Sequence, residues 1–496
     1  MPGLTSHSDV SDASTKFSAS SSDPLPLPDR FAKLKRKLIA GNEAAVADSF
    51  YRLLRQLRKE ADRIAAIRSD IIPTIDFLDI HDPDCEAAFS KQLRKRGVAV
   101  IRGVVPPNVA EAWREETQEY IDQSPYHTKG FPPEDPQMFD LYWSPGQVRA
   151  RADSRMLEAQ RFAMRAWGSR RDDALVSSNY PVVYADRFRI RKPGDTSMGI
   201  GPHIDGGSVE RWEPDGYGRG GTYRKIFEGR WEEHDPWDSS ARLGVTSDLY
   251  NGAGACSMFR MFQGWLALSP IAPGGGTLLV CPMLQLTTAY LLLRPFFSPR
   301  AGPGGGGEAD FLHESNWRLD ARPSSVVHGA VPGHIQELSA ALHPHLQLGR
   351  TMVAVPRVGP GDYVVWHPDA VHAADAVNAA PVDSSVLYVP ACPLTQTNAL
   401  YLASQRRAFL LGLPAPDFGD GSRSAIRGGE SEHLGRPGVQ DVKDAGGEEG
   451  LCSIGLLAFD EERAASRVER ELVRLANSIL FPDRFDMCYK RPAKDA

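Results

Sequence analysis

Two short segments that lie far apart in the chain carry the residues of a predicted metal site. The first, His203-Ile204-Asp205, places an imidazole and a carboxylate two residues apart, so that on a strand both side chains point to the same face. The second is a mostly apolar run that starts at Gly361 and ends at His372. A small β-barrel can bring such segments together, because it places distant strands side by side. The sequence therefore predicts a barrel with a metal centre formed by His203, Asp205 and His372.

The three side chains, two imidazoles and one carboxylate, form the ligand set that suits ferrous iron and leaves one octahedral face open. Glycines at positions 199, 201, 206 and 207 surround the first pair and would let the backbone approach a small ion. A different interpretation stays open, in which His203 and Asp205 form a surface ion pair and His372 caps a turn.

The segment His367-Pro368-Asp369 repeats the spacing of the first pair. Its proline disfavours a regular central strand, because proline cannot donate a hydrogen bond to a neighbouring strand. We therefore expect His367 to line the pocket or to support the metal ligands rather than to bind the metal.

Composition and charge limit the classes of function. Of the 496 residues, 42% are hydrophobic and 24% are charged, which is typical of a globular protein with a sizeable core. The net charge of −6 creates no field that would attract nucleic acid or an anionic membrane, and no apolar stretch reaches the roughly 20 residues of a membrane span. We expect a small-molecule substrate as the partner, and neither nucleic acid nor membrane. The oligomeric state stays open.

The amino terminus and the cysteines indicate the cytoplasm. Residues 1–28 are rich in Ser, Asp and Pro, which predicts a disordered tail, and they lack the basic and apolar regions of a secretory signal. The six cysteines are scattered without CxxC spacing, as expected for free thiols in a reducing compartment. A cytoplasmic enzyme is therefore expected.

A helical region is predicted between residues 29 and 181. Apolar residues at three-to-four spacing predict helices, and the apolar run Gly97–Val105 predicts a strand that joins the core and is buried on both faces. The expected helices cover residues 29–68, 85–95, 108–121 and 158–167.

A β-rich catalytic core is predicted over residues 182–418, with loop inserts at 206–255 and 300–350. The expected strands cover residues 187–191, 258–269, 276–281, 362–366 and 385–390, and a helix covers residues 398–411. A flexible loop rich in Gly, Asp and Glu is expected over residues 419–450. A helical segment is expected over residues 451–496.

The two inserts are expected to form the walls and the lid of the pocket. Five residues of the first insert either contact a polar or anionic small molecule or occupy ordinary packing and surface positions: Arg211, Trp212, Arg224, Trp231 and Trp237. In the second insert, His343 and His345 flank a proline and are expected to be solvated.

Four segments resemble the iron(II)- and 2-oxoglutarate-dependent oxygenases, and more narrowly the YbiU-like family of uncharacterised oxygenases. The segments are residues 203–212 (HIDGGSVERW), 262–265 (FQGW), 361–372 (GDYVVWHPDAVH) and 387–391 (LYVPA). The similarity extends from about Phe77 to Phe418. The narrower set of segments is long, and it is therefore more specific than the short superfamily motif.

The resemblance implies an α+β protein whose core is a double-stranded β-helix, a cupin-like jelly roll with flanking helices and long loop inserts. It implies that His203, Asp205 and His372 bind Fe(II) and are catalytic, with 2-oxoglutarate as co-substrate and dioxygen as oxidant. The implied reaction is the oxidation of a small molecule, in the simplest case a hydroxylation. Two other functions stay open: a cupin-like metal protein with an isomerase, hydrolase or ligand-binding role, and a non-catalytic regulatory protein.

One feature of the resemblance is absent. Many members of the superfamily place an arginine about ten residues after the distal histidine to bind the far carboxylate of 2-oxoglutarate, whereas residues 373–405 contain neither Arg nor Lys. Another cation must then pair with this carboxylate, because a buried unpaired charge is very costly. The candidate co-substrate residues are Arg191, Arg189, Arg260, Tyr388 and Ser385. Salt bridges to Asp186 or Asp195 are the alternative for the arginines.

Overall fold

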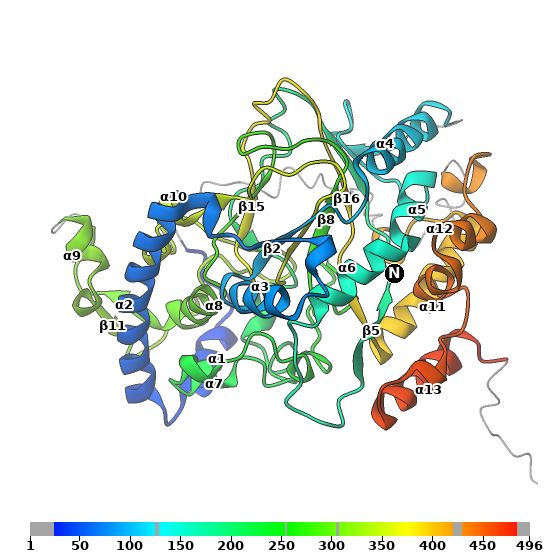
Figure 1. The fold of residues 1–496 in the computed structure, drawn as a ribbon. Helices are drawn as coiled ribbons and strands as arrows, with labels where there is room; N and C mark the ends of the chain where they lie inside the picture. Colours follow the sequence, from blue (N-terminus) through cyan, green and yellow to red (C-terminus); the bar gives the residue numbers. More distant parts are fainter. Residues whose placement is uncertain (1–23, 125–127, 253–254, 304–306, 420–428, 484–496) are drawn as a thin grey trace, which may run out of the picture.

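The computed structural model describes residues 24–124, 128–252, 255–303, 307–419 and 429–483 and shows a mixed α+β protein with several sheets (Figure 1). Most of the expected amino-terminal tail, residues 1–23, and the last residues, 484–496, lie outside the described residues. None of the helices in the described ranges combines the length and the apolar character needed to cross a membrane.

Two central sheets carry the residues of the predicted site. In spatial order, the larger sheet contains β1 (Thr74–Asp76), β2 (Val98–Arg102), β14 (Tyr363–Trp366), β8 (Gln263–Ala267), β16 (Ser384–Tyr388), β6 (Phe188–Arg191), β4 (Met138–Phe139) and β3 (Gly130–Phe131). The smaller sheet contains β12 (Gln336–Glu337), β7 (His203–Ile204), β15 (His372–Ala374), β9 (Leu278–Val280) and β13 (Val353–Ala354).

The chain passes repeatedly between these two sheets. The strands β6, β8, β14 and β16 belong to the larger sheet, whereas β7, β9, β13 and β15 belong to the smaller one. Apart from the parallel pair β1–β2, the pairings within the two sheets are antiparallel. Residues that are neighbours in a sheet are therefore far apart in the sequence.

Helices cover the strands on both sides (Figure 1). The helices before the core are α1 (Arg30–Ile39), α2 (Glu43–Ile67), α3 (Pro83–Arg96), α4 (Pro107–Asp122), α5 (Pro145–Ala152) and α6 (Ser154–Met164). Later helices are α7 (Arg224–Phe227), α8 (Leu284–Leu293), α9 (Glu308–Leu312), α10 (Leu348–Thr351), α11 (Gln396–Leu411), α12 (Val439–Ser453) and α13 (Arg467–Leu480). In Figure 1, α2 and α8 lie to the left of the central strands, and α11, α12 and α13 lie to the right.

Two smaller sheets lie beside the core. The strands β10 (Phe297–Pro299) and β11 (Trp317–Leu319) form one antiparallel pair, and β5 (Val176–Val182) and β17 (Cys392–Thr395) form the other. The second pair packs with α11 and α13 around a separate cluster of buried apolar residues.

Local sequence signals account for several of these elements. Asp82 caps the start of α3 by accepting hydrogen bonds from the backbone N–H groups of Asp84 and Cys85, and Gly97 ends the helix with a positive φ of 75°. The next strand, β2, has its first four residues buried, as the apolar run predicts. The helices that we expect between residues 29 and 167 are present as α1 to α4 and α6.

The second insert differs from the expected loop, because it supplies one strand of the smaller sheet. Gln336 and Glu337 form β12 and pair with Ile204 and His203 of β7. A strand of two residues is too short to show the alternation of apolar and polar residues that would reveal it in the sequence.

The loop expected over residues 419–450 is also partly wrong. Residues 420–428 lie outside the described part of the chain, but Val439–Ser453 forms α12, which packs on α5. A Cβ atom at Gly446 would lie 1.8 Å from the carbonyl oxygen of Ala152. The close approach of the two helices therefore requires glycine, a residue that hides the helical signal.

The histidines of the second insert are buried, contrary to the expectation that they are solvated. The side chains of His343 and His345 are 1% and 4% exposed, and His328 lies beside them with its Nδ1 atom buried and unpartnered among the described residues. Burial, followed by the charge of Arg294, lowers the pKa of His343 and His345 to about 3 and that of His328 to about 2. All three imidazoles are therefore neutral in the folded protein near pH 7.

The neutral histidine cluster predicts a loss of stability in acid. The unfolded chain protonates each imidazole below a pH of about 6.5, whereas the folded chain does so only near pH 3, so the free energy of unfolding falls as the pH drops below about 6.5. Each histidine contributes about 1.4 kcal/mol per pH unit in this range. Urea denaturation at pH 7.5, 5.5 and 4.5 measures the slope, which reaches its full value between the two lower pH values.

The variant His343→Gln should reduce this slope by about 1.4 kcal/mol per pH unit. The matched control is His81→Gln, because the His81 side chain is 67% exposed and should leave the slope unchanged. Equal slopes for the parent and His343→Gln would contradict the assignment of a neutral buried imidazole at this position.

Candidate metal centre

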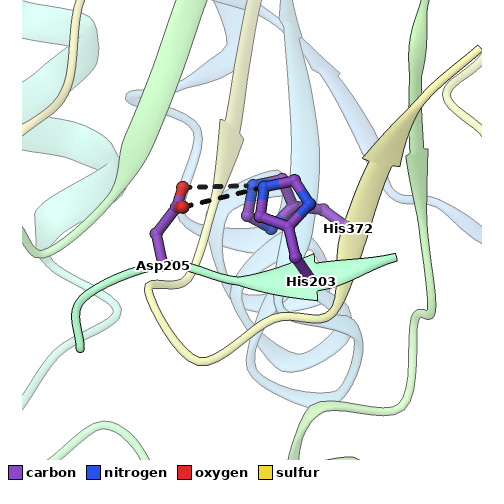
Figure 2. A group of neighbouring side chains, drawn as sticks. All are labelled: His203, Asp205 and His372. Carbon is purple, nitrogen blue, oxygen red and sulfur yellow. Dashed lines mark ion pairs between the residues drawn. The ribbon is translucent and has the colours of Figure 1, made fainter. Parts of the chain in front are cut away.

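The pairing of two short strands brings the predicted metal ligands together. His203 on β7 lies directly opposite His372 on β15, so both imidazoles project from the same face of the smaller sheet, and their ring centroids are 4.2 Å apart. Asp205 follows the end of β7, and Figure 2 shows its carboxylate turned toward both rings. Its Oδ1 lies 3.7 Å from Nε2 of His203, and its Oδ2 lies 3.3 Å from Nε2 of His372. One ligand atom of each residue lies within 4.8 Å of the other two.

Backbone carbonyls fix the orientation of both imidazoles. Nδ1 of His203 is 2.8 Å from the carbonyl oxygen of Gly201, and Nδ1 of His372 is 3.0 Å from that of Ala370. A carbonyl oxygen only accepts, so each Nδ1 carries the proton and donates it. In the neutral imidazoles, Nε2 then presents its lone pair toward Asp205, which is the arrangement that a metal ligand needs.

The charges of the site favour a deprotonated donor set. Burial and the neighbouring His372 lower the pKa of His203 to about 4. Burial would raise the pKa of Asp205, but its contacts with His372 and His203 and the charge of Arg260 hold it well below its usual value. Neutral imidazoles and an ionised carboxylate are the protonation states that bind a metal cation.

The turn after Asp205 requires glycine. Gly206 and Gly207 have φ values of 77° and 90°, a region that side chains with a Cβ atom rarely adopt. A Cβ atom at Gly207 would also lie 2.3 Å from the carbonyl oxygen of Ser247. Gly206 and Gly207, two of the four glycines expected to let the backbone approach an ion, thus serve the turn that positions Asp205.

A buried charge network holds this turn. Arg211 donates hydrogen bonds to the carbonyl oxygens of Asp205 at 2.7 Å and Gly207 at 2.6 Å. Its guanidinium also lies 3.9 Å from Asp369, which receives a 2.5 Å ion pair from Arg242. Asp369 precedes His372 by three residues. The network therefore links the segment of Asp205 to the segment of His372.

Asp369 is the centre of the network. The Tyr223 hydroxyl donates to its Oδ1 at 2.9 Å. Burial would raise the pKa of Asp369, but the charge of Arg242 lowers it well below its usual value, so the carboxylate stays ionised. Its neighbour His367 donates from Nε2 to the carbonyl oxygen of Pro236 at 3.0 Å, while its Nδ1 accepts from the backbone of Asp369. The second HxD pair is thus fully used in structural contacts.

Arg191 is committed to other partners. Its side chain is fully buried, and Nε donates to Oδ2 of Asp195 at 2.7 Å. The terminal nitrogens donate to the carbonyl oxygens of Asp195, Asp375 and Ala376. The salt bridge to Asp195, left open by the sequence, is therefore the one observed, and it occupies the guanidinium that we expected to bind a co-substrate.

Arg189 differs sharply from its neighbour. It is 6% exposed, its only side-chain hydrogen bond within the described part of the chain is donated to the carbonyl oxygen of Gly276 at 3.3 Å, and its Nε has no partner there. Gly276 precedes β9 of the smaller sheet, whereas Arg189 lies on β6 of the larger one. The guanidinium therefore spans the space between the sheets without a counter-charge.

The register of the larger sheet places Tyr388 and Ser385, two of the candidates, on opposite faces. Tyr388 lies opposite Trp265, and alternation places it on the same face as Arg189. Ser385 lies on the opposite face, where its Oγ accepts a hydrogen bond from Nε of Arg114 at 3.0 Å. Ser385, expected as a co-substrate residue, therefore lies on the face opposite to Arg189, and its hydroxyl has a partner there.

Two further polar residues on the same face as Arg189 were not expected from the sequence. Gln263 and Trp366 are cross-strand partners, and the Trp366 ring lies 5.4 Å from that of His372, so this face is turned toward the site. Both side chains are buried, and Nε2 of Gln263 and Nε1 of Trp366 have no hydrogen-bond partner among the described residues. The segments 262–265 and 361–372 contain them, but only the sheet register reveals which face they occupy.

The aromatic residues of the first insert serve packing. Trp212, Trp231 and Trp237 are buried, and their indole nitrogens donate to backbone carbonyls of distant segments. Arg224 is exposed and lies 3.7 Å from Glu228. Of the two interpretations, packing and surface positions account for these residues.

The central carboxylate of the network should be essential for stability. The variant Asp369→Asn leaves two buried arginines without their charge partner, and we expect the free energy of unfolding to fall by about 3–5 kcal/mol. Urea denaturation measures this change. The control Asp173→Asn removes an exposed ion pair with Arg171 and should have little effect. Similar stabilities of the two variants would mean that the network does not stabilise the fold.

Comparison with known proteins identifies relatives along most of the chain. The profile of the family described as Gig2-like matches residues 25–456. The chain is 30% identical over 412 residues to the uncharacterized protein YbiU of Escherichia coli strain K12, which covers 80% of this chain and 91% of YbiU.

Solved structures agree with this match. GlcNAc Inducible Gene 2, GIG2 (DUF1479), from Candida albicans superposes with a TM-score of 0.82 at 30% identity and covers 93% of this chain and 96% of its own. The hypothetical protein JW0805 from Escherichia coli superposes with a TM-score of 0.70 at 29% identity and covers 86% and 98%. The chain belongs to the Gig2-like family.

Proposed function

We propose that the protein is a non-haem iron(II)- and 2-oxoglutarate-dependent dioxygenase that oxidises, most simply hydroxylates, a small molecule. The observation that carries this proposal is the convergence of His203, Asp205 and His372, with both Nδ1 protons bound to backbone carbonyls. Two imidazole nitrogens and one carboxylate on one side of an ion suit ferrous iron and leave positions for a co-substrate and dioxygen.

The order of the strands supports a double-stranded β-helix as the core. Strands that alternate between two facing antiparallel sheets, as β6 to β9 and β13 to β16 do, are the pattern of a jelly roll. In such a core the short strands β7 and β15 can hold metal ligands on the face that turns inward. The inward face of the larger sheet then contributes Arg189, Gln263 and Trp366 to the same space.

The unpartnered polar atoms in this space fit an acidic co-substrate. Arg189, Gln263 and Trp366 each contain a buried nitrogen without a hydrogen-bond partner among the described residues. Buried donors are costly when they stay unpaired, so a ligand with several acceptor oxygens would stabilise them. We assign Arg189 to the far carboxylate of 2-oxoglutarate, because a guanidinium fork matches a carboxylate and Arg189 has no carboxylate of its own.

When bound, iron with 2-oxoglutarate and dioxygen supplies the oxidant for a C–H bond, and the co-substrate is converted to succinate and carbon dioxide. The protein's own residues orient these partners. Gly201 and Ala370 fix the imidazoles, and Arg211 fixes the turn after Asp205. The free thiols Cys256, Cys281 and Cys392, which are buried, fit the reducing environment of the cytoplasm, where we place the enzyme.

Removal of a metal ligand should abolish co-substrate turnover. With Fe(II), 2-oxoglutarate, air and a metabolite extract, we expect the parent to release succinate and the variants His203→Ala and His372→Ala to release it at least about 100-fold more slowly, because loss of a supporting residue alone costs about 10- to 100-fold. Quantification of succinate by mass spectrometry measures the rates. The exposed His81→Ala is the control.

Two results would contradict the proposal. Equal succinate release by the parent and His203→Ala would exclude the ligand assignment. Metal binding without any succinate from the parent would favour a cupin-like protein with a non-oxidative or ligand-binding role.

The assignment of Arg189 predicts a selective effect on the co-substrate. Loss of a charged hydrogen bond costs about 1.5–3 kcal/mol, so Arg189→Gln should raise the KM for 2-oxoglutarate about 10- to 100-fold. Arg224→Gln, at an exposed arginine, should leave the KM unchanged. Initial rates of succinate release at increasing concentrations of 2-oxoglutarate give the KM of each variant. An unchanged KM in Arg189→Gln would show that another residue binds the carboxylate.

A further inference from the structure

Arg260 is a second arginine near the site that has no ion-pair partner among the described residues. It lies three residues before Gln263, the first residue of β8, and its guanidinium lies over the Tyr184 ring with Cζ 5.8 Å from the centroid. Within the described ranges it forms no hydrogen bond and no ion pair. The carboxylate of Asp205 is within electrostatic reach of this guanidinium.

The other groups around Arg260 do not neutralise it. Asp186 is within electrostatic reach, but it already forms an ion pair with Arg187 at 3.5 Å. Cys256 and Tyr184 are buried, and burial raises the pKa of both side chains, so both are uncharged near pH 7. The carboxylate of Asp205 is the remaining group that could neutralise Arg260. A carboxylate that binds a metal ion shares its negative charge with that ion.

Arg189 and Arg260 approach the site from opposite ends of β8. Arg189 is level with Ala267, the last residue of β8, because both pair with Val386. Arg260 precedes Gln263, the first residue of β8. Along the strand, Gln263 and Ala267 are roughly 13 Å apart. Gln263 in turn lies opposite Trp366, whose ring contacts His372. Arg260 is therefore placed for a molecule other than the one that Arg189 binds.

A charge count leads to the same conclusion. If iron and the dianionic co-substrate are bound, the positive charges of iron and Arg189 equal the negative charges of the co-substrate and Asp205. Arg260 then contributes one positive charge that no group of the site balances. A partly buried, unpaired cation is costly, and an anion that enters with the second substrate would relieve this cost.

We propose that Arg260 binds an anionic group, a carboxylate or a phosphate, of the molecule that is oxidised. This inference rests on the proposed function, and it deepens it by naming the substrate class as small organic acids or phosphate esters. The planar guanidinium matches the oxygens of either group, and its N–H groups have no hydrogen-bond partner within the described ranges. Arg260 would thus hold the substrate on the Asp205 side of the centre, while Arg189 holds the co-substrate between the sheets.

The first experiment separates substrate binding from co-substrate binding. A metabolite extract is divided on an anion exchanger into anionic and neutral fractions, and succinate release by the Fe(II)-loaded protein is measured with each. We expect only the anionic fraction to stimulate the parent, and Arg260→Gln to lose this stimulation at least about tenfold. Its KM for 2-oxoglutarate should not show the 10- to 100-fold rise that we expect for Arg189→Gln. Arg260→Lys should retain part of the stimulation, and the control Arg224→Gln should retain all of it.

A second experiment needs no turnover. Inorganic phosphate is titrated into the metal-free protein at constant ionic strength, and the thermal unfolding midpoint is followed. Phosphate should raise the midpoint of the parent and of Arg224→Gln, and it should raise that of Arg260→Gln by less than half as much, because one anion site is lost.

Distinct results would overturn each proposal. The Arg260 assignment is wrong if Arg260→Gln keeps the stimulation or if only the neutral fraction stimulates the parent. It is equally wrong if the KM of Arg260→Gln for 2-oxoglutarate rises as much as that of Arg189→Gln. It is also wrong if phosphate stabilises Arg260→Gln as strongly as the parent. Absence of succinate from every protein, the parent included, would instead reject the proposed function, and the phosphate titration would still decide whether Arg260 binds anions.

Discussion

The antiparallel pairing of β7 with β15 is the constraint on which the site depends. It places His203 directly opposite His372, and a shift by one residue would turn one imidazole to the other face of the sheet. Both strands are short, so their few backbone hydrogen bonds need support. Asp369 and its two arginines supply this support, because they tie the turn after Asp205 to the segment that leads into His372.

The arginines of this region fall into two groups that differ in their partners. Arg191, Arg211 and Arg242 are buried and paired with carboxylates or carbonyl oxygens, so they stabilise the scaffold. Arg189 and Arg260 are close to the same space, but neither forms an ion pair within the described residues. Two cations without an ion pair among the described residues, beside a carboxylate and two imidazoles, support the proposed binding of anionic ligands, since water alone compensates a buried charge poorly.

Much of the fold follows from local sequence signals. The capped helix α3, the amphipathic helices α1 and α2 and the apolar strand β2 agree with the sequence, because their stability depends on neighbouring residues. The two-residue strand β12 and the glycine-containing helix α12 could not be predicted, since distant contacts stabilise both. The helix α8 is buried on almost every side and shows no apolar periodicity, so the sequence pattern does not reveal it.

The sequence alone determined the chemistry of the candidate ligands: two histidines and one aspartate, with the HxD spacing that directs two of them to one side. The tertiary structure decided which charged and polar residues surround them. Arg189 and Arg191 are equivalent in the sequence, two residues apart on one strand, but only Arg191 meets the carboxylate of Asp195. Histidines 343 and 345 are likewise polar in sequence but buried in the fold. The reason is physical: a residue type is a local property, whereas a hydrogen-bond partner or a neighbouring charge comes from segments that meet only when the chain folds.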